Sequence, residues 1–393
     1  MTSRAPLPLA ARCVLALLVL GLAWGLDTWR RPAEPGAAQA VFATASDKQA
    51  VDVHALKPVA SGKIPMPEGA LAAHASNLLA MPAGSKAVLT AFWFAGDRES
   101  APNVQIAASQ FDRDTQQWLA ARYVVDRHVM GEQLGFGLRR LGNPVAWLDA
   151  SGRMHLFVVA TGWGGWAAGR ILHLVQRSAD NQLAAMEFEP VRVLPLSWLW
   201  NTSFLVRNNP LPLKDGGMLL PAHFEIGIKY PVALRFDRDG EFLGMVRMSQ
   251  RPYLLQPTLL PQSETAWVAL MRDHRPDGHV TAVQTLDAGQ TWRDLPDLSL
   301  VNPDAAIAGL ALAPGQMVLT HNSSAHSRQV LDLSSSADGM QWLSQATLAR
   351  GTEGDEYSYP AVAWADGSLW LSYTDHRRSI AWQRFAAAGQ GTP

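Results

Sequence analysis

The chain has 393 residues, and its 33 Lys and Arg residues almost balance its 34 Asp and Glu residues, which gives a formal net charge of −1. Proteins that bind nucleic acid or anionic surfaces rely on a basic excess, so this balance argues against either kind of partner. The 15 Trp, 31 Gly and 25 Pro residues are typical of a turn-rich β fold rather than a helical one.

The chain begins with a segment that has the form of an export signal. Residues 7–26 are mostly apolar, with Arg4 before them and Arg12 among them, as in a secretory signal. The stretch is nearly long enough to span a bilayer, and the small-residue site ending at Ala40 lies far downstream for cleavage. Residues 1–31 are therefore predicted to be either a cleaved signal peptide or an uncleaved anchor in the inner membrane. Both predict an exported protein of the periplasm or cell surface.

The segment after the leader differs from both its neighbours in composition. Residues 32–60 are rich in Ala, Pro and Gly, and they predict a flexible tether to one folded domain over residues 61–386, with a tail over 387–393. The only cysteine, Cys13, lies in the leader, so no disulfide is expected in the folded domain. We expect contact with a membrane only through the N-terminal segment.

The folded domain is predicted to consist of repeated β units. Each unit opens with a polar or aromatic residue, usually followed by Pro, and continues as an apolar strand, a turn and another strand. The six opening residues are His74, Asn143, Asn209, Gln256, Asn302 and Tyr359. Repeats of this length in a β-rich chain indicate the blades of a propeller, so six blades are expected.

A second motif recurs in phase with these units. Residues 285–292 read TLDAGQTW, which predicts a β-hairpin tip in which Asp accepts turn N–H groups, Gly takes a positive φ and Trp packs on the hairpin. Weaker copies lie at 336–342, 236–242 and 111–118, and the closing aromatic residues 242, 292 and 342 follow at intervals of 50 residues.

The hairpin motif is the Asp-box, and together with the blade openings it resembles the bacterial sialidase-like (BNR-repeat, predicted neuraminidase) family. The resemblance covers roughly residues 64–384 and is carried by the stretches 76–79, 92–99, 142–144, 256–258, 302–303, 356–360 and 373–380. It implies an all-β chain that forms a six-bladed β-propeller of the sialidase type, preceded by an N-terminal signal or anchor helix.

The resemblance also implies a catalytic constellation. Sialidases hold the substrate carboxylate with three arginines, attack the anomeric carbon with a Tyr that a Glu activates, and protonate the leaving oxygen with a carboxylic acid. By position, Arg272 and Arg328 match two of the arginines and Tyr359 matches the nucleophile. Glu225 is then the residue expected to polarise Tyr359, and Glu99 is the expected acid.

The chain departs from the family pattern at two positions. His74 stands where the first arginine is expected, and Gln256 stands where a glutamate is expected. A histidine suits acid–base work near neutral pH but does not replace a guanidinium fork. The substrate could therefore be a uronate or another acidic sugar rather than sialic acid. Asp97 competes with Glu99 for the role of acid.

Three further residues are candidates for substrate binding, namely Arg98, His223 and Asn143. Each candidate also has an ordinary structural interpretation. The arginines could be surface or inter-blade ion pairs, and Tyr359 could be a packed aromatic residue. The histidines could be buried structural residues, and the Asn-Pro pairs could be turn formers.

The sequence thus predicts an exported sialidase-like glycoside hydrolase, of the exo-α-sialidase type, that acts on an acidic sugar, sialic or uronic, of a glycan or polysaccharide. Two alternatives stay open: a non-catalytic glycan-binding propeller, and a polysaccharide lyase that uses His74, His223 or Tyr359 as base and acid. No His/Cys cluster has metal-ligand spacing and no Gly-rich loop leads from a strand into a helix, so neither a metal nor a cofactor is predicted.

Overall fold

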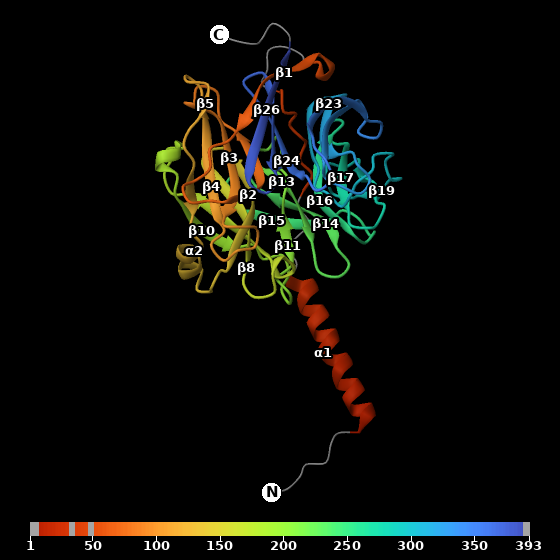
Figure 1. Cartoon of the computed structure of the whole chain (residues 1–393). Helices are drawn as coiled ribbons and strands as arrows, with labels where there is room; N and C mark the ends of the chain where they lie inside the picture. Colours follow the sequence, from red (N-terminus) through yellow and green to blue (C-terminus); the bar gives the residue numbers. More distant parts are fainter. Residues whose placement is uncertain (1–7, 31–35, 46–50, 388–393) are drawn as a thin grey trace.

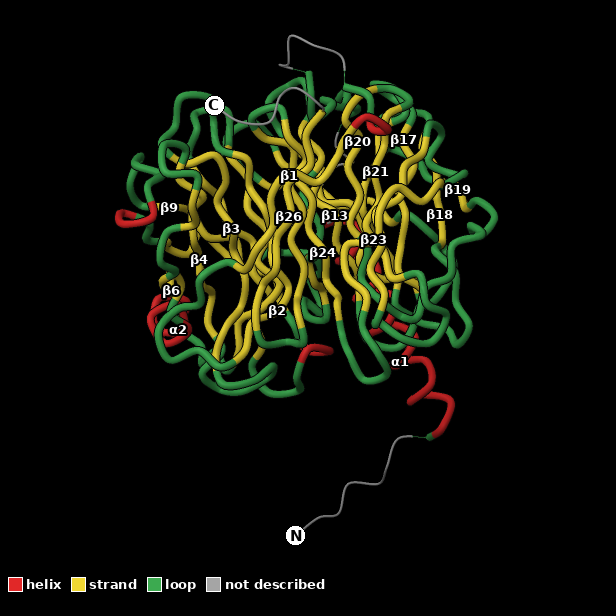
Figure 2. The backbone as a smooth tube through the Cα atoms, turned by 45° about the horizontal axis from the view of Figure 1, so that its top comes forward, coloured by secondary structure: helices red, strands yellow, loops and turns green. Residues whose placement is uncertain are grey.

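The computed structural model, which describes residues 8–30, 36–45 and 51–387, is a six-bladed β-propeller (Figures 1 and 2). Six antiparallel sheets of four or five strands surround one axis, and turns gather at the two ends of the strands. The predicted fold class is therefore confirmed. Arg4 and the predicted tail from residue 388 onward lie outside the described residues.

The blades follow one another in chain order, each built from its inner strand outward. The first three blades contain β2 (Ala72–Ala80), β3 (Ala87–Gly96), β4 (Gln105–Asp112), β5 (Gln117–Trp118) and β6 (Arg122–Val125); β7 (Arg140–Leu148), β8 (Met154–Thr161), β9 (Arg170–Gln176) and β10 (Phe188–Val193); and β11 (Phe204–Val206), β12 (Leu211–Pro212), β13 (Met218–Phe224), β14 (Tyr230–Phe236) and β15 (Phe242–Arg247).

The last three blades contain β16 (Leu254–Pro261), β17 (Trp267–Asp273), β18 (Thr281–Thr285) and β19 (Arg293–Asp294); β20 (Ala308–Ala313), β21 (Gln316–Asn322), β22 (Val330–Ser336) and β23 (Leu343–Arg350); and β24 (Tyr357–Ala365), β25 (Ser368–Asp375), β26 (Ser379–Ala387) and β1 (Leu56–Lys63). The helices are α1 (Leu9–Arg30), α2 (Arg127–Leu134) and the short 3₁₀ turns η1 (Val53–Ala55), η2 (Trp166–Ala168) and η3 (Leu183–Ala185).

The last blade closes the ring, because its outer strand comes from the other end of the chain. Strand β1 pairs with β26 from Leu56 to Lys63, so the propeller begins inside the segment that was expected to be a tether. Ala40, which is 1% exposed, also forms a bridge with Leu213 on the third blade. Buried apolar side chains thus fix parts of residues 32–60 against the blades.

The Asp-box has the geometry that its sequence predicts. Asp287 Oδ1 accepts a hydrogen bond from the Thr291 N–H at 2.9 Å, Gly289 has a φ of +86°, and Trp292 Nε1 donates to the Gly289 carbonyl at 3.0 Å. Asp338 repeats this turn in the next blade. Both turns join the third and fourth strands of a blade, at the end opposite to the starts of the inner strands. They therefore stabilise hairpins and take no part in a site at the other end.

Four inner strands share an irregularity near their starts. Ala75, Asn143, Gln256 and Tyr359 have φ between +43° and +55°, and the pairing register shifts at each of these positions. Such a conformation costs roughly 1–3 kcal/mol in a residue other than glycine, and bulges of this kind re-aim side chains. Three of the four residues are predicted site residues, so the strain lies where a functional site is expected.

A buried histidine pair in the second blade is expected to make the fold sensitive to acid. His155 Nδ1 lies 2.8 Å from His173 Nε2, and both side chains are at most 2% exposed. Burial lowers the pKa of His173 to about 2, and it also lowers the pKa of His155. Below pH 6.5 these histidines are protonated in the unfolded chain but stay neutral in the folded chain. The free energy of unfolding is therefore highest above pH 6.5 and decreases as the pH falls.

We expect His173 to account for about 2 kcal/mol of the fall in the free energy of unfolding between pH 6.5 and pH 5. Urea titrations at several pH values measure this dependence. In His173→Gln, the number of protons taken up on unfolding below pH 6.5 should be smaller by about one. His326→Gln, at a side chain that is 78% exposed, is the control. An unchanged slope in His173→Gln would contradict the assignment.

Candidate functional site

The candidate site lies at the end of the propeller axis from which the inner strands start. His74 lies in β2, Gln256 in β16 and Tyr359 in β24, each near the start of an inner strand. Arg272 lies near the end of β17, and Arg328 lies just before β22. Because neighbouring strands are antiparallel, the end of a second strand lies beside the start of the first. The structure thus brings these five predicted residues to one end of the axis.

Tyr359 is the centre of this cluster. Its hydroxyl accepts a hydrogen bond from Arg272 Nη1 at 3.3 Å, and its ring centroid lies 4.2 Å from that of His74. Burial raises the pKa of Tyr359, but the cations Arg272 and Arg328 and hydrogen bonds from Gln256 and Arg272 outweigh burial, so the pKa falls below its usual 10. A phenol in this field ionises more easily than a free tyrosine and is suited to act as a nucleophile.

Asp304 holds two of the arginines side by side. Arg272 Nε donates to Asp304 Oδ1 at 2.6 Å, and Arg328 Nη2 donates to the Asp304 backbone carbonyl at 2.6 Å. The second carboxylate oxygen of Asp304 lies 3.0 Å from His274 Nδ1. Arg272 also donates to Gln256 Oε1 at 3.3 Å through Nη1. The orientation of the Arg272 guanidinium is therefore fixed from two sides.

Glu356 joins Arg328 to a further arginine, Arg377, in the turn between β25 and β26. Glu356 Oε1 accepts from Arg328 Nη1 at 3.2 Å and from the Ser358 hydroxyl at 2.6 Å, and Oε2 accepts from Arg377 Nε at 2.7 Å. Arg377 Nη1 also donates to Glu99, which lies 278 residues earlier in the chain. The predicted acid is thus ion-paired with an arginine on the neighbouring blade.

The cluster carries an excess of positive charge. Four guanidinium groups, those of Arg207, Arg272, Arg328 and Arg377, face three carboxylates, those of Asp304, Glu356 and Glu99, so four minus three leaves one positive charge. In a partly buried site this excess favours an anionic group. A carboxylate matches the arginine forks in shape as well as in charge.

His74 is held neutral. The side chain is 2% exposed, and neither ring nitrogen has a hydrogen-bond partner among the described residues. Burial, followed by the charges of Arg377 and the other arginines, lowers the pKa of His74 well below 6.5. The ring cannot supply the positive charge of the arginine that it replaces in the family pattern. Its nitrogens are free among the described residues, but the same surroundings that lower its pKa make the imidazole a weak base.

Glu99 and Arg377 border a small cavity. The space between His74, Arg98, Glu99 and Arg377 is too narrow to hold a water molecule, whereas ordinary ligand pockets measure roughly 300–1,000 Å³. Asp97 is exposed and is not among the lining residues, and its backbone N–H donates to Asn103 Oδ1 at 3.3 Å. Of the two candidate acids, Glu99 therefore faces the cluster. A ligand would have to part the ion pair between Arg377 and Glu99.

Glu225 and His223 form a pair of their own in β13 and the loop after it. His223 Nε2 lies 3.0 Å from Glu225 Oε2, and Lys229 Nζ donates to the Glu225 carbonyl at 2.8 Å. Burial raises the pKa of Glu225, but the hydrogen bond and charge of His223 and the charges of Lys229 and Arg272 lower it to about 2. Among the described residues, no hydrogen bond joins Glu225 to Tyr359. Its expected polarising role stays a prediction.

Two functional candidates were missed in the sequence. Arg207, which follows β11, is 1% exposed and donates to the Ser76 carbonyl at 3.1 Å and to the Pro360 carbonyl at 2.6 Å. Burial lowers its pKa to about 10. Arg377 lies in the stretch 373–380 that carried the family resemblance. A signal was present in both cases, because Arg207 lies two residues before Asn209, the opening of the third unit, and Arg377 lies in a stretch already singled out.

The predicted Asn143 occupies the bulge of β7, with a φ of +43° and 8% of its surface exposed. This is the position that Gln256 and Tyr359 occupy in their own blades. Its blade thus presents an amide near the same end of the axis.

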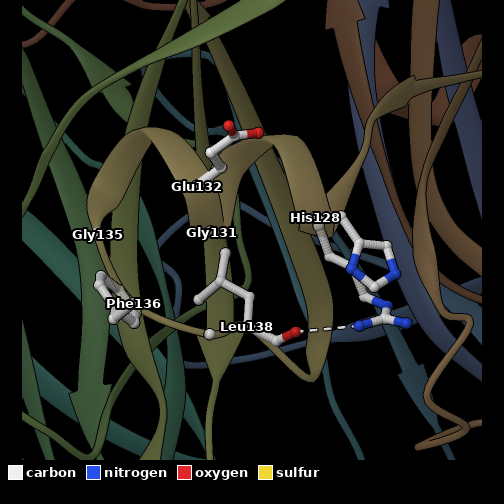
Figure 3. Close-up of a pocket in the computed structure, with 8 residues that line it drawn as sticks. His128, Gly131, Glu132, Gly135, Phe136 and Leu138 are labelled. Carbon is white, nitrogen blue, oxygen red and sulfur yellow. Dashed lines mark hydrogen bonds between the residues drawn. The ribbon is translucent and has the colours of Figure 1, made fainter.

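A second pocket, beside α2, is separate from this cluster (Figure 3). Arg127 Nη1 donates to the Leu138 carbonyl at 3.1 Å, and Gly135 ends the helix with a φ of +73°. Glu132 points away from Leu138 in Figure 3. The pocket is a groove at a helix end with few polar groups that converge. It is a weaker candidate for ligand chemistry than the arginine cluster.

A ring of six blades with arginines gathered at one end of its axis defines a sialidase-type β-propeller. The chain belongs to the family described as "BNR repeat-like domain", whose family model matches residues 87–371. No curated protein gives a significant match to the chain.

Solved structures resemble the chain in fold. The Hadza microbial sialidase Hz136 is 14% identical, with a TM-score of 0.67 over 83% of this chain and 67% of that one. A protein of unknown function from Dyadobacter fermentans is 12% identical, with a TM-score of 0.63 over 85% of this chain and 99% of that one. The Trypanosoma rangeli sialidase in complex with sialic acid is 12% identical, with a TM-score of 0.62 over 86% of this chain and only 59% of that one.

Proposed function

We propose that the protein is an exported glycoside hydrolase that removes an acidic sugar from a glycan at the arginine cluster. The observation that carries this proposal is the position of the Tyr359 hydroxyl beside Arg272, in a field that lowers the pKa of the phenol. A neutral phenol can approach an anionic sugar that would repel a carboxylate nucleophile, and its loss of a proton then requires the nearby cations.

In the proposed mechanism the substrate carboxylate binds to Arg272, Arg328 and Arg377. It takes the place of Glu99 on Arg377, which opens the small cavity between them. Glu225, the expected partner of Tyr359, accepts the phenolic proton as the Tyr359 oxygen attacks the anomeric carbon. The bond from that carbon to the leaving oxygen breaks, and Glu99 transfers its proton to that oxygen. Water then adds its hydroxyl to the anomeric carbon and returns a proton to Glu99, while the bond to Tyr359 breaks and Tyr359 takes its proton back from Glu225. Glu99, released from its cation and close to an anion, takes up a proton more readily.

The proposed location rests on the N-terminal helix. Helix α1 is long and apolar enough to cross a membrane, and none of its residues is buried against the propeller. An export signal and an anchor both have this form. We propose that α1 directs export and that the propeller works outside the cytoplasm.

A glycan panel tests the proposed function. The full chain in detergent is incubated with sialylated and uronate-containing glycans, and the products are measured by mass spectrometry. We expect a free acidic sugar, and we expect Arg272→Ala to reduce its release at least 100-fold, because a buried charge-assisted pair contributes several kcal/mol. Arg293→Ala, at an exposed arginine on the Asp-box end of the same blade, is the control. A folded protein without product from any glycan would favour the glycan-binding propeller.

His74 supports a second candidate, a polysaccharide lyase. His74 is unprotonated at neutral pH, which is the state that a base needs to abstract the proton next to a uronate carboxylate, although its lowered pKa makes it a weak base. The product would be an unsaturated uronate that absorbs ultraviolet light. Cleavage without this absorbance would exclude the lyase.

A further inference from the structure

The end of the propeller that carries the candidate site also carries a group of exposed apolar side chains. They belong to the loops after β8, before β11 and after β13, all at the end where the inner strands start. We call this group the aromatic rim: Trp163 (85% exposed), Trp198 (43%), Leu199 (71%), Trp200 (58%), Ile226 (44%) and Ile228 (58%). A patch of this kind marks an interaction surface in a water-soluble domain.

The members of the rim are neighbours in space. Trp163, Trp198, Leu199 and Trp200 line one open groove. The loop that carries Ile226 joins them, because the Ile226 N–H donates to the Ser203 hydroxyl at 2.8 Å, at the end of the loop before β11. The rim is therefore one continuous surface drawn from the second and third blades.

The N-terminal helix leaves the molecule beside this rim. The Arg30 guanidinium carbon lies 5.4 Å from the centre of a Trp198 ring, and Figure 1 shows α1 projecting from the propeller end near β8 and β11. The 22 residues of α1 would reach about 33 Å at 1.5 Å per residue, which is enough to cross the apolar core of a bilayer. A membrane entered by α1 would thus lie next to the rim.

Cations accompany the indole rings. The Arg139 guanidinium lies 4.1 Å from the centre of the Trp163 ring, and the guanidinium of Arg170 lies 5.6 Å from the ring of Phe136, which lines the same groove. Tryptophan rings with arginines beside them are enriched at membrane interfaces, where indoles lie at headgroup level and cations meet phosphates.

We propose that the aromatic rim docks onto the surface of the bilayer that α1 enters, so the propeller itself contacts the membrane. Trp198, Leu199 and Trp200 insert at headgroup depth, and the candidate site then opens close to the lipid surface. If the proposed function holds, on which this last step rests, the substrate is an acidic glycan attached to a membrane component rather than a free oligosaccharide.

Depth measurements on the full chain in lipid vesicles test the docking. In a Cys13→Ser background, Leu199→Cys is labelled with an environment-sensitive fluorophore, and quenching is measured with lipids that carry nitroxides at the headgroup or along the acyl chain. Leu286→Cys is the matched control, because this leucine is 59% exposed on an Asp-box turn at the opposite end. We expect at least fivefold stronger headgroup quenching at residue 199 than at residue 286.

A second variant checks that the rim, and not the label, produces the insertion. Replacing Trp198 and Trp200 with Ser should remove most of the quenching at residue 199 while α1 keeps the protein in the vesicles. Equal quenching at residues 199 and 286, or quenching that survives the double replacement, would overturn the proposal. The quenching measurement does not depend on enzymatic activity. Docking without glycan cleavage would therefore contradict only the proposed function. Glycan cleavage without docking would contradict only the proposal that the aromatic rim binds the membrane.

Discussion

Tyr359→Phe is expected to lower kcat on the acidic glycan by on the order of 1,000-fold or more, with less than a fivefold change in substrate binding. The variant removes the attacking oxygen, but it leaves the arginines and their carboxylate partners in place. Steady-state kinetics and a separate binding measurement on the variant check both expectations. Turnover at the wild-type rate would contradict the proposed mechanism.

Two controls separate a catalytic effect from a structural one. Tyr253→Phe, at a tyrosine that is 43% exposed, should leave kcat unchanged. An alkaline titration followed by ultraviolet absorbance should show one early phenolate in the wild-type protein, because cations lower the pKa of Tyr359 while burial raises the pKa of Tyr230 and Tyr373. That early step should be missing from Tyr359→Phe.

Removal of β1 is expected to destabilise the propeller by on the order of 5 kcal/mol. Seven residue pairs join β1 to β26, and each backbone hydrogen bond contributes roughly 1 kcal/mol net. Leu56, at 8% exposure, adds a buried side chain. A loss of this size is comparable with the whole stability of many domains. Urea unfolding of a chain that begins at residue 64 provides the measurement.

The comparison for this truncation is a chain that begins at residue 51, which keeps η1 and β1 but lacks the contacts of residues 36–45. We expect it to unfold at a clearly higher urea concentration than the chain from residue 64. If both chains unfolded together, β1 would contribute nothing to closure of the ring.

The fold could be predicted from the sequence because its signals are local. The Asp-box at 285–292 forms its turn within eight residues, and the blade openings precede their own strands. The closing strand gives no such signal. In β1 only Leu56 is buried and most other residues are exposed, since the strand lies at the outer edge of its blade. Its partner, β26, lies at the other end of the described propeller, and no local pattern indicates that pairing.

The candidate site was predictable only in part. Tyr359, Arg272 and Gln256 were found because each lies at a repeated position, and the structure brings them into hydrogen-bond contact. Asp304 and Glu356 were missed, because a carboxylate shows its importance only when its arginine partners from other strands are known.

Closure by β1 has a consequence for the biogenesis of the protein. Strand β1 is synthesised first among the strands, and its partner β26 is synthesised last. At roughly 5–20 residues per second, about 20 to 60 seconds separate Leu56 from its partner Ala387. During that interval the first blade and the newest blade each lack one neighbour, and the edge of β1 has no strand to pair with. Until its last strand emerges, the chain therefore exposes an unpaired strand edge and unpaired blade faces, which are the surfaces most prone to aggregation.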